Sequence, residues 1–235
     1  MFRNTAHVYD LIYEASGKDY AAEASQLNDL IQARNPGARS VLDVACGTGG
    51  HLLHLRQWYE VEGLDLDAGM LGQARGRLPD IPLVEGDMRS FQLGRQFDAV
   101  VCLFSSIGYM QTTEELDLAM ATMASHLNAG GVLIVDGWVR PEAWRGPVST
   151  HVETAANDEI KVARVSFARQ EDRKTRLEMH HVIATSDGVD HVVDVHELTL
   201  FEVTEYVDAM TRAGLAVETT EGPIPDRDRY IGTKP

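Results

Sequence analysis

A strand that runs through a glycine turn into a helix constrains the fold of this chain more than any other segment. Residues 41–45 read Val-Leu-Asp-Val-Ala, Gly47 and Gly49 follow, and residues 51–58 have the apolar spacing of a helix. Glycine lets the backbone turn sharply and approach a ligand closely, and a helix offers free N–H groups at its start. The segment therefore predicts a ligand site at the turn, and the alternative is a glycine turn without a ligand.

The residues that follow repeat this alternation of strand and helix. Strands are expected at residues 41–45, 61–65, 82–85, 97–103 and 132–136, and helices at 51–58, 68–77 and 113–127. Strands that alternate with crossover helices lie parallel, so the pattern predicts an open α/β sheet. The first 36 residues also have helical spacing, up to the break at Asn35-Pro36-Gly37.

After Asp136 the pattern changes to period-two alternation. Four antiparallel strands are expected at residues 148–153, 160–170, 176–185 and 191–200, with hairpin turns at 157–158 and 186–188. A helix at 204–213 and strands at 215–220 and 229–232 then complete the α/β part. The sequence thus predicts an antiparallel insertion between the fifth strand and the last helix. We divide the chain into a ligand-binding core with N-terminal helices (1–139), the insertion (140–200) and the C-terminal part of the core (201–235).

Two carboxylates follow neighbouring strands of the expected sheet. Asp65 ends the second strand and Asp87 follows the third, so both are expected at the carboxyl edge where such sheets bind ligands. There Asp65 can accept hydrogen bonds from both hydroxyls of a ribose. Asp87 can accept a hydrogen bond from the amino group of an adenine while Met88 packs on the adenine ring. Taken alone, each acid can also cap a helix or a turn. A dinucleotide fold competes, but Leu52 stands at the third glycine position of its fingerprint.

Composition excludes several classes of partner. The 235 residues include 21 basic and 36 acidic side chains, a net charge of −15, and this field repels the phosphate backbones of nucleic acids. No apolar run approaches the roughly 20 residues of a membrane span, and no signal pattern begins the chain. Cys46 and Cys102 are typical of buried free thiols in a reducing cytoplasm, and no Cys/His spacing resembles a metal site. We expect a cytoplasmic protein that binds a small molecule; an anionic one requires a locally basic site.

Several motifs resemble those of one enzyme family. The run from Asp43 to Gly49, Asp65 and residues 86–89 resemble the motifs of class I S-adenosylmethionine-dependent methyltransferases. Nearly the whole chain is similar to the N,N-dimethyltransferases that act on thymidine-diphosphate-linked amino-deoxysugars in antibiotic biosynthesis, such as the precursors of desosamine and mycaminose. The runs that carry this likeness are Tyr9-Asp10-Leu11, residues 17–20, residues 104–109, Trp138 with Pro141-Glu142, residues 164–166 and residues 198–201.

The resemblance implies a class I Rossmann-like sheet, S-adenosylmethionine as cofactor, and N-methylation, ending in N,N-dimethylation, of a nucleotide-linked amino sugar. It assigns cofactor binding to Tyr9, Tyr20, Ala45, Gly47, Gly49, Asp65, Asp87, Met88 and Leu103. Tyr109 would lie near the substrate nitrogen and orient the amine; by itself it reads equally as a half-buried aromatic residue. Arg164 and Arg227 would pair with the diphosphate, and Trp138 and Arg140 would contact sugar or thymine. Arg145 and Arg229 are further basic residues near this side of the chain.

The chain departs from the family pattern on the substrate side. Residues 136–142 read Asp-Gly-Trp-Val-Arg-Pro-Glu where the family has Glu-Pro-Trp-Trp-Phe-Pro-Glu, and no tyrosine of the kind some members carry precedes Tyr9. The identity of the sugar therefore stays open. The alternatives are a methyltransferase for another small amine or hydroxyl, and a catalytically silent S-adenosylmethionine-binding module.

The insertion is interpreted as a lid that carries the substrate pocket. Its alternative is a surface elaboration without contact to the chemistry. An appended antiparallel sheet has an uncovered face and edges, so we expect a homodimer to bury them. The histidines of the insertion are expected mostly at the surface or at an interface: His180, His181, His191 and His196.

Overall fold

The strand–turn–helix unit of the sequence forms the centre of a seven-stranded sheet. The computed structural model describes residues 5–235, and the sheet has the order β10-β11-β5-β4-β1-β2-β3. The first five strands are parallel, and β10 and β11 are antiparallel to their neighbours. The strands are β1 (Ser40–Val44), β2 (Glu60–Asp65), β3 (Leu83–Glu85), β4 (Phe97–Cys102), β5 (Leu127–Val139), β10 (Ala216–Glu221) and β11 (Arg227–Thr233).

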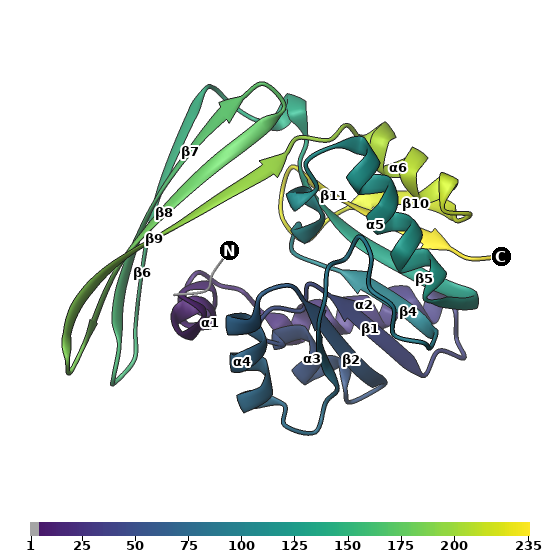
Figure 1. The fold of residues 1–235 in the computed structure, drawn as a ribbon, viewed down its shortest axis with the longest axis horizontal. Coiled ribbons are helices and arrows are strands. Elements are labelled where there is room, and N and C mark those ends of the chain that lie inside the picture. The colour runs from purple at the N-terminus through teal and green to yellow at the C-terminus, as the bar shows by residue number, and fades with distance from the viewer. Residues whose placement is uncertain (1–4) are drawn as a thin grey trace.

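Helices cover both faces of this sheet because its strands are apolar on both sides. Val41, Ala99 and Ile134 pack on one face with α2 (Tyr20–Arg34), α3 (Gly50–Leu55) and α4 (Ala68–Arg77). The residues next to them in sequence, Leu42 and Val100 among them, pack on the other face with α5 (Thr113–Ser125) and α6 (Val203–Arg212). Figure 1 shows α5 and α6 together on one side of the sheet. Because β1, β2, β3 and β4 run parallel, their carboxyl ends lie at one edge of the sheet.

The N-terminal segment forms two helices, and the residues that divide them were not predicted. It forms α1 (Ala6–Ala15) and α2, separated by Gly17 with φ +92° and by Asp19, whose side chain accepts from the Ala22 N–H. A glycine in the left-handed region ends the first helix, and an aspartate cap starts the second. Helix α1 is not packed on the core alone: Val8 and Ile12 join the apolar cluster of the insertion.

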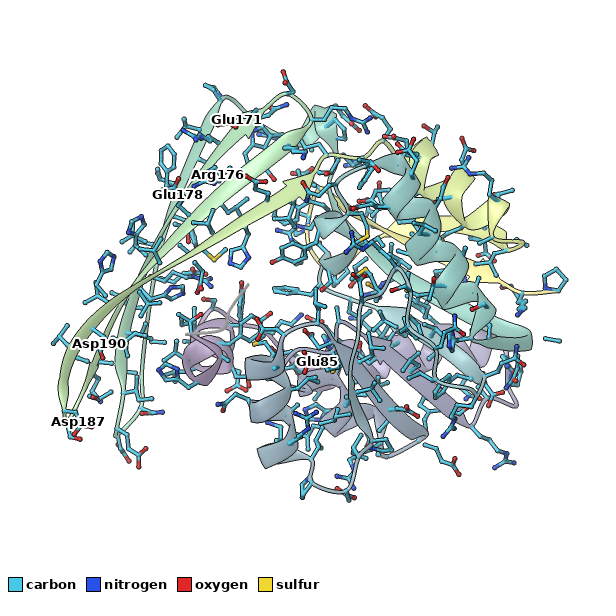
Figure 2. The ribbon with its side chains drawn as sticks, in the orientation of Figure 1. Glu85, Glu171, Arg176, Glu178, Asp187 and Asp190 are labelled. Carbon is cyan, nitrogen blue, oxygen red and sulfur yellow. The ribbon has the colours of Figure 1, made fainter. Side chains whose placement is uncertain are left out.

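The insertion is a four-stranded antiparallel sheet that extends from the core as a curved arm (Figure 1), confirming the predicted fold class. Its strands are β6 (Val148–Ala156), β7 (Lys161–Glu171), β8 (Lys174–Thr185) and β9 (Gly188–Thr199). Two short 3-10 helices, η1 (Ser106–Tyr109) and η2 (Pro141–Ala143), lie where it joins the core. Glu171 and Asp187 lie at opposite ends of the arm (Figure 2). No helix within residues 5–235 is long and apolar enough to cross a membrane.

Candidate active site

Three adjoining cavities lie at the carboxyl edge of the core sheet, and Tyr9 and Ser106 line all of them. The strand-edge cavity, about 370 Å³, has walls that include Ala45, Gly47, Asp65, Asp87 and Met88. The inner cavity, about 40 Å³, has walls that include Lys18, Tyr20, Asp43, Gly47 and Leu103. The lid cavity, about 380 Å³, lies under the insertion, with Tyr109, Trp138, Arg164, His196 and Arg227 in its walls. Of the residues assigned to the cofactor, Gly49 alone is missing from these walls.

Backbone of unusual conformation forms the turns at this edge. Ala45, Phe104 and Ser105 have positive φ angles of 62°, 54° and 65°, where side chains are strained by about 1–3 kcal/mol each. Gly47 and Gly49 adopt φ angles of 57° and 77° without that cost. A Cβ at Gly49 would also lie 2.8 Å from Leu78 Cδ1. Gly49 therefore serves the turn and its packing against the end of α4, beneath the cavity rather than in its wall.

We expect Gly50→Ala to weaken cofactor binding and to lower the free energy of unfolding by about 1–3 kcal/mol, the usual cost of overpacking. A Cβ at Gly50 would lie 2.7 Å from the ring of Tyr20, which lines the inner cavity with it. Gly72→Ala is the control, because a Cβ there meets nothing within 4 Å. Calorimetric titration and denaturant unfolding measure both effects. Equal behaviour of the two variants would contradict the assigned contact with Tyr20.

Asp65 is held rigidly at the end of β2. Its two oxygens accept from the backbone N–H groups of Gly47 and Asp67, each at 2.8 Å. Burial raises the pKa of this carboxyl, while the same backbone hydrogen bonds oppose the shift. Each oxygen keeps a further lone pair for a ligand in the strand-edge cavity. The placement suits the predicted contact with ribose hydroxyls.

Asp87 is paired in a way that its sequence position does not reveal. The Arg89 side chain donates a hydrogen bond from Nε to Asp87 Oδ1 at 3.0 Å. Arg89 also donates from Nη1 to Glu115 Oε1 at 2.6 Å. The hydrogen bonds from Arg89 lower the pKa of the Asp87 carboxyl. Arg89 thus fixes the carboxylate beside Met88 in the strand-edge cavity. Arg89 belongs to the 86–89 run that resembles the methyltransferase motif, but the sequence did not indicate which residue it contacts.

Asp43 supplies the test of whether the inner cavity fits a cofactor. Both of its carboxylate oxygens are buried and have no hydrogen-bond partner among residues 5–235, and burial raises its pKa. Lys18 lies in the same cavity, 3.9 Å from the centroid of the Phe104 ring and 2.7 Å from Glu23 Oε2. An ammonium group would satisfy Asp43, and Lys18 can donate to a carboxylate. The methionine end of S-adenosylmethionine carries both groups, so these residues fit it.

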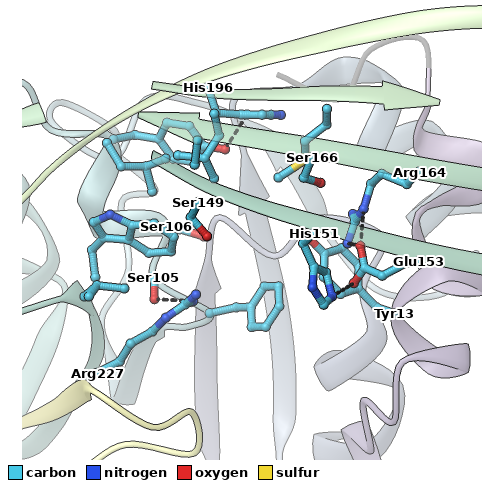
Figure 3. A pocket seen from close by; sticks show the side chains of 18 of the residues that line it. Tyr13, Ser105, Ser106, Ser149, His151, Glu153, Arg164, Ser166, His196 and Arg227 are labelled. Carbon is cyan, nitrogen blue, oxygen red and sulfur yellow. Dashed lines mark hydrogen bonds and ion pairs between the residues drawn. The ribbon is translucent and has the colours of Figure 1, made fainter. Parts of the chain in front are cut away.

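Arg227 is a half-buried cation without a carboxylate partner among residues 5–235. No carboxylate in the described part of the chain lies within 4 Å of its guanidinium, which donates to Ser105 Oγ at 3.2 Å. The guanidinium lies over the Trp138 ring at 4.2 Å, and burial lowers its pKa to about 10. Arg227 therefore stays charged at neutral pH. Its positive charge faces the lid cavity, where the carboxylate in the wall, Glu153, is paired with Arg164 (Figure 3).

Three of the other arginines on this side of the chain have acidic partners: Arg140, Arg164 and Arg229. Arg164 lines the lid cavity across from Arg227 (Figure 3), and its Nε lies 2.6 Å from Glu153 Oε2. Arg140 lines none of the three cavities; it lies 3.4–3.7 Å from Asp228, Asp226 and Glu142. Arg145 is exposed, and Arg229 forms a buried pair with Asp136 at 2.7 Å. The structure thus brings Arg164, Arg227 and Trp138 to one cavity and leaves Arg140 outside it.

Tyr109 contacts a histidine that sequence reasoning placed at the surface. Its hydroxyl lies 2.8 Å from His196 Nδ1, and both residues line the lid cavity. Burial lowers the pKa of His196 to about 3 and raises that of Tyr109. His181 is buried as well, whereas His180 is half-buried and His191 and His151 are exposed. The alternation of β9, which points His196 inward with Asp194 and Leu198, was the available signal.

Comparison with known proteins agrees with this site. Residues 41–131 match the family model of a methyltransferase domain. The chain is 50% identical to the dTDP-3-amino-3,4,6-trideoxy-alpha-D-glucopyranose N,N-dimethyltransferase of Streptomyces venezuelae, over 97% of this chain and 96% of that protein. The crystal structure of Streptomyces venezuelae DesVI has a TM-score of 0.92 at 49% identity and covers 99% of both chains. The S-adenosylmethionine-bound amino pentose methyltransferase CalS10 from Micromonospora echinaspora has a TM-score of 0.86 at 37% identity, with 97% of both chains covered.

These similarities extend through the insertion as well as the core. The matched regions cover nearly the full length of both chains and so include the core and the antiparallel sheet. The cofactor is S-adenosylmethionine, as the sequence motifs predicted. The chain belongs to the amino-sugar N,N-dimethyltransferase family of the class I S-adenosylmethionine-dependent methyltransferases.

Proposed function

We propose that the chain methylates the amino group of a thymidine-diphosphate-linked amino-deoxysugar twice in succession, in antibiotic biosynthesis. The observation that carries this proposal is Arg227, a half-buried guanidinium without a carboxylate within 4 Å among the described residues, in a cavity next to the cofactor site. Such a cation favours an anionic ligand, and a diphosphate supplies the charge. The activity of the 50% identical Streptomyces venezuelae relative supports the same substrate class.

The residues of the site divide the work of methyl transfer. When bound, the cofactor supplies an electrophilic methyl group on a sulfonium. Asp65 and Asp87 hold the nucleoside end, and Asp43 and Lys18 hold the methionine end. Tyr109 stands at the junction of the strand-edge and lid cavities, where the acceptor amine must meet the methyl group. Holding the two reactants in line can supply several kcal/mol of the barrier.

The test is mass spectrometry of a panel of thymidine-diphosphate sugars incubated with the protein and S-adenosylmethionine. The panel contains 3-amino and 4-amino deoxysugars, the same sugars with a hydroxyl in place of the amine, and an amino sugar already attached to an aglycone. We expect a gain of one and then two methyl groups on the nucleotide-linked amino sugars alone. No gain across the nucleotide sugars refutes the proposal, and methylation of the aglycone-linked sugar alone supports another acceptor class.

We further propose that the outer face of the insertion pairs with a second copy of the chain. This face carries the exposed apolar side chains of all four strands: Val148, Val152, Val165, Phe167, Val182, Val189, Val193 and Val195. The opposite, inner face of the sheet packs against α1 and forms part of the wall of the lid cavity. A contiguous apolar patch of this kind marks an interaction site, and a two-fold pairing places equal patches together.

We expect Val165→Glu to convert the dimer to a monomer at micromolar concentration. Val165 pairs with Val152 and His180 on neighbouring strands, so a carboxylate there places charge in the middle of the outer face. Leu118→Glu is the control, because Leu118 is equally exposed but lies on α5 of the core. Sedimentation velocity gives the mass. A monomeric unsubstituted protein, or a dimeric Val165→Glu variant, contradicts the proposed interface.

A cytoplasmic location is also part of the proposal. Cys46 and Cys102 are both buried and free, as predicted from their apolar settings. Burial raises the pKa of both thiols, so neither is a reactive thiolate. Two free, buried cysteines suit a reducing compartment.

A further inference from the structure

Tyr109 and His196 form a buried hydrogen-bonded pair between two parts of the fold. Tyr109 comes from η1 at the end of β4, and His196 comes from β9 of the insertion. The Tyr109 hydroxyl oxygen lies 2.8 Å from His196 Nδ1, drawn as a dashed line at His196 in Figure 3. The His196 side chain belongs to the buried polar residues, with 2% of its surface exposed. The pair therefore joins the lid to the edge of the cofactor site.

The chemistry of the two groups decides which of them donates. Burial keeps His196 neutral, because its pKa falls to about 3, and burial also keeps the phenol of Tyr109 protonated. A phenolic O–H is a stronger donor than the N–H of a neutral imidazole, and a bare imidazole nitrogen is a stronger acceptor than a phenol oxygen. The Tyr109 O–H therefore donates to Nδ1, and the His196 ring carries its proton on Nε2.

We propose that His196 is a positioning residue for methyl transfer: it binds the hydroxyl hydrogen of Tyr109, so that the Tyr109 oxygen presents only lone pairs to the acceptor amine. The inference rests on the proposed N-methylation. Tyr109 lines both the strand-edge cavity and the lid cavity, so its oxygen lies between the two reactants. If the hydrogen pointed at the amine instead, it would bind the nitrogen lone pair that has to attack.

The direction of this hydrogen matters at each transfer. The nitrogen lone pair forms a bond to the methyl carbon, the carbon–sulfur bond breaks with its electrons on sulfur, and the new ammonium releases one proton to water. A neutral primary amine has two N–H bonds that can donate to the Tyr109 oxygen, and the monomethyl amine has one. A Tyr109 oxygen that only accepts holds that single N–H and leaves the lone pair facing the methyl group. The second transfer should therefore depend on His196 more than the first.

A double-variant cycle of His196→Leu and Tyr109→Phe tests the inference. His196→Leu is expected to lower kcat for the second methylation about tenfold, the value of a well-placed hydrogen bond, with KM for the sugar within about twofold. The monomethylated sugar should accumulate. His196→Gln, which keeps a hydrogen-bond acceptor, should restore dimethylation, and His54→Leu, a half-buried histidine on α3, should match the unsubstituted protein. In the Tyr109→Phe background His196→Leu should cost nothing further.

The outcomes separate this inference from the proposed function. If the unsubstituted protein methylates no nucleotide amino sugar, the proposed function fails. If it does, and His196→Leu still lowers kcat about tenfold in the Tyr109→Phe background, His196 acts by another route and the inference is overturned. Nitrogen-15 NMR of the His196 ring gives a readout apart from turnover. A proton on Nε2 is expected, and a proton on Nδ1 overturns the inference.

Discussion

Arg227→Ala should raise KM for the nucleotide sugar by about 30-fold to 4,000-fold, the loss of about 2–5 kcal/mol when one partner of a charged contact buried by the ligand is removed. The guanidinium has no carboxylate within 4 Å in the described chain and is oriented by Ser105 and the Trp138 ring. Its charge is therefore available for a diphosphate. Steady-state kinetics with saturating S-adenosylmethionine measure the effect, and KM for the cofactor should change little.

Two matched variants define what this result means. Arg140→Ala should leave KM unchanged, because Arg140 lies among Glu142, Asp226 and Asp228 outside the cavities. Arg164→Ala should raise KM as well, since it leaves Glu153 in the lid cavity without its cationic partner and facing the ligand. If neither Arg227→Ala nor Arg164→Ala changes KM for the nucleotide sugar, the assignment of the diphosphate to this cavity is wrong.

Asp65→Ala should raise the Kd of S-adenosylmethionine by about 100-fold or more. The carboxylate is held by the N–H groups of Gly47 and Asp67 at 2.8 Å, so a charged acceptor is presented to the ligand with little loss of side-chain entropy. Two hydrogen bonds to a charged group contribute about 1.5–3 kcal/mol each. Isothermal titration calorimetry gives the Kd directly.

The control for this prediction is Asp80→Ala, which removes an exposed carboxylate that pairs with Arg56. It should leave the Kd within about twofold, as surface ion pairs contribute little. Asp65→Asn, which keeps an acceptor oxygen but loses the charge, should fall between the two. A Kd for Asp65→Ala equal to that of Asp80→Ala would move the ribose contact to another residue of the strand-edge cavity.

Local pattern predicted most of the fold. Strand and helix alternation placed the central strands and α4 well, because an apolar run and its neighbouring turn are encoded within a few residues. It failed where the break is a single glycine: Gly17 divides the N-terminal segment into α1 and α2. The pattern also predicted too short a fifth strand. β5 begins at Leu127, which pairs with Phe97 before a register shift in the pairing with β4.

The site was predicted unevenly. Six of the residues assigned to the cofactor line the strand-edge cavity: Tyr9, Ala45, Gly47, Asp65, Asp87 and Met88. All except Tyr9, which lies on α1, follow or end parallel strands, whose carboxyl ends share one edge of the sheet. Partners that depend on packing were missed: Arg89 beside Asp87, Asp43 and Lys18 in the inner cavity, and His196 beside Tyr109. Arg140 was assigned to the substrate because its neighbours in space, Asp226 and Asp228, lie about 90 residues away in sequence.

The sequence by itself determined the α/β core and the antiparallel insertion, since the alternation of strands and helices is a local property of the chain. Its resemblance to class I methyltransferases indicated the cofactor. The family of the protein also follows from residues spread along it. Only the tertiary structure decided which arginine is free to bind an anion. A guanidinium is neutralised by whatever carboxylate the fold brings within about 4 Å, and those contacts join residues that the sequence leaves far apart. In this way Glu153 pairs with Arg164 and Asp136 pairs with Arg229, whereas the guanidinium of Arg227 remains available to a ligand in the lid cavity.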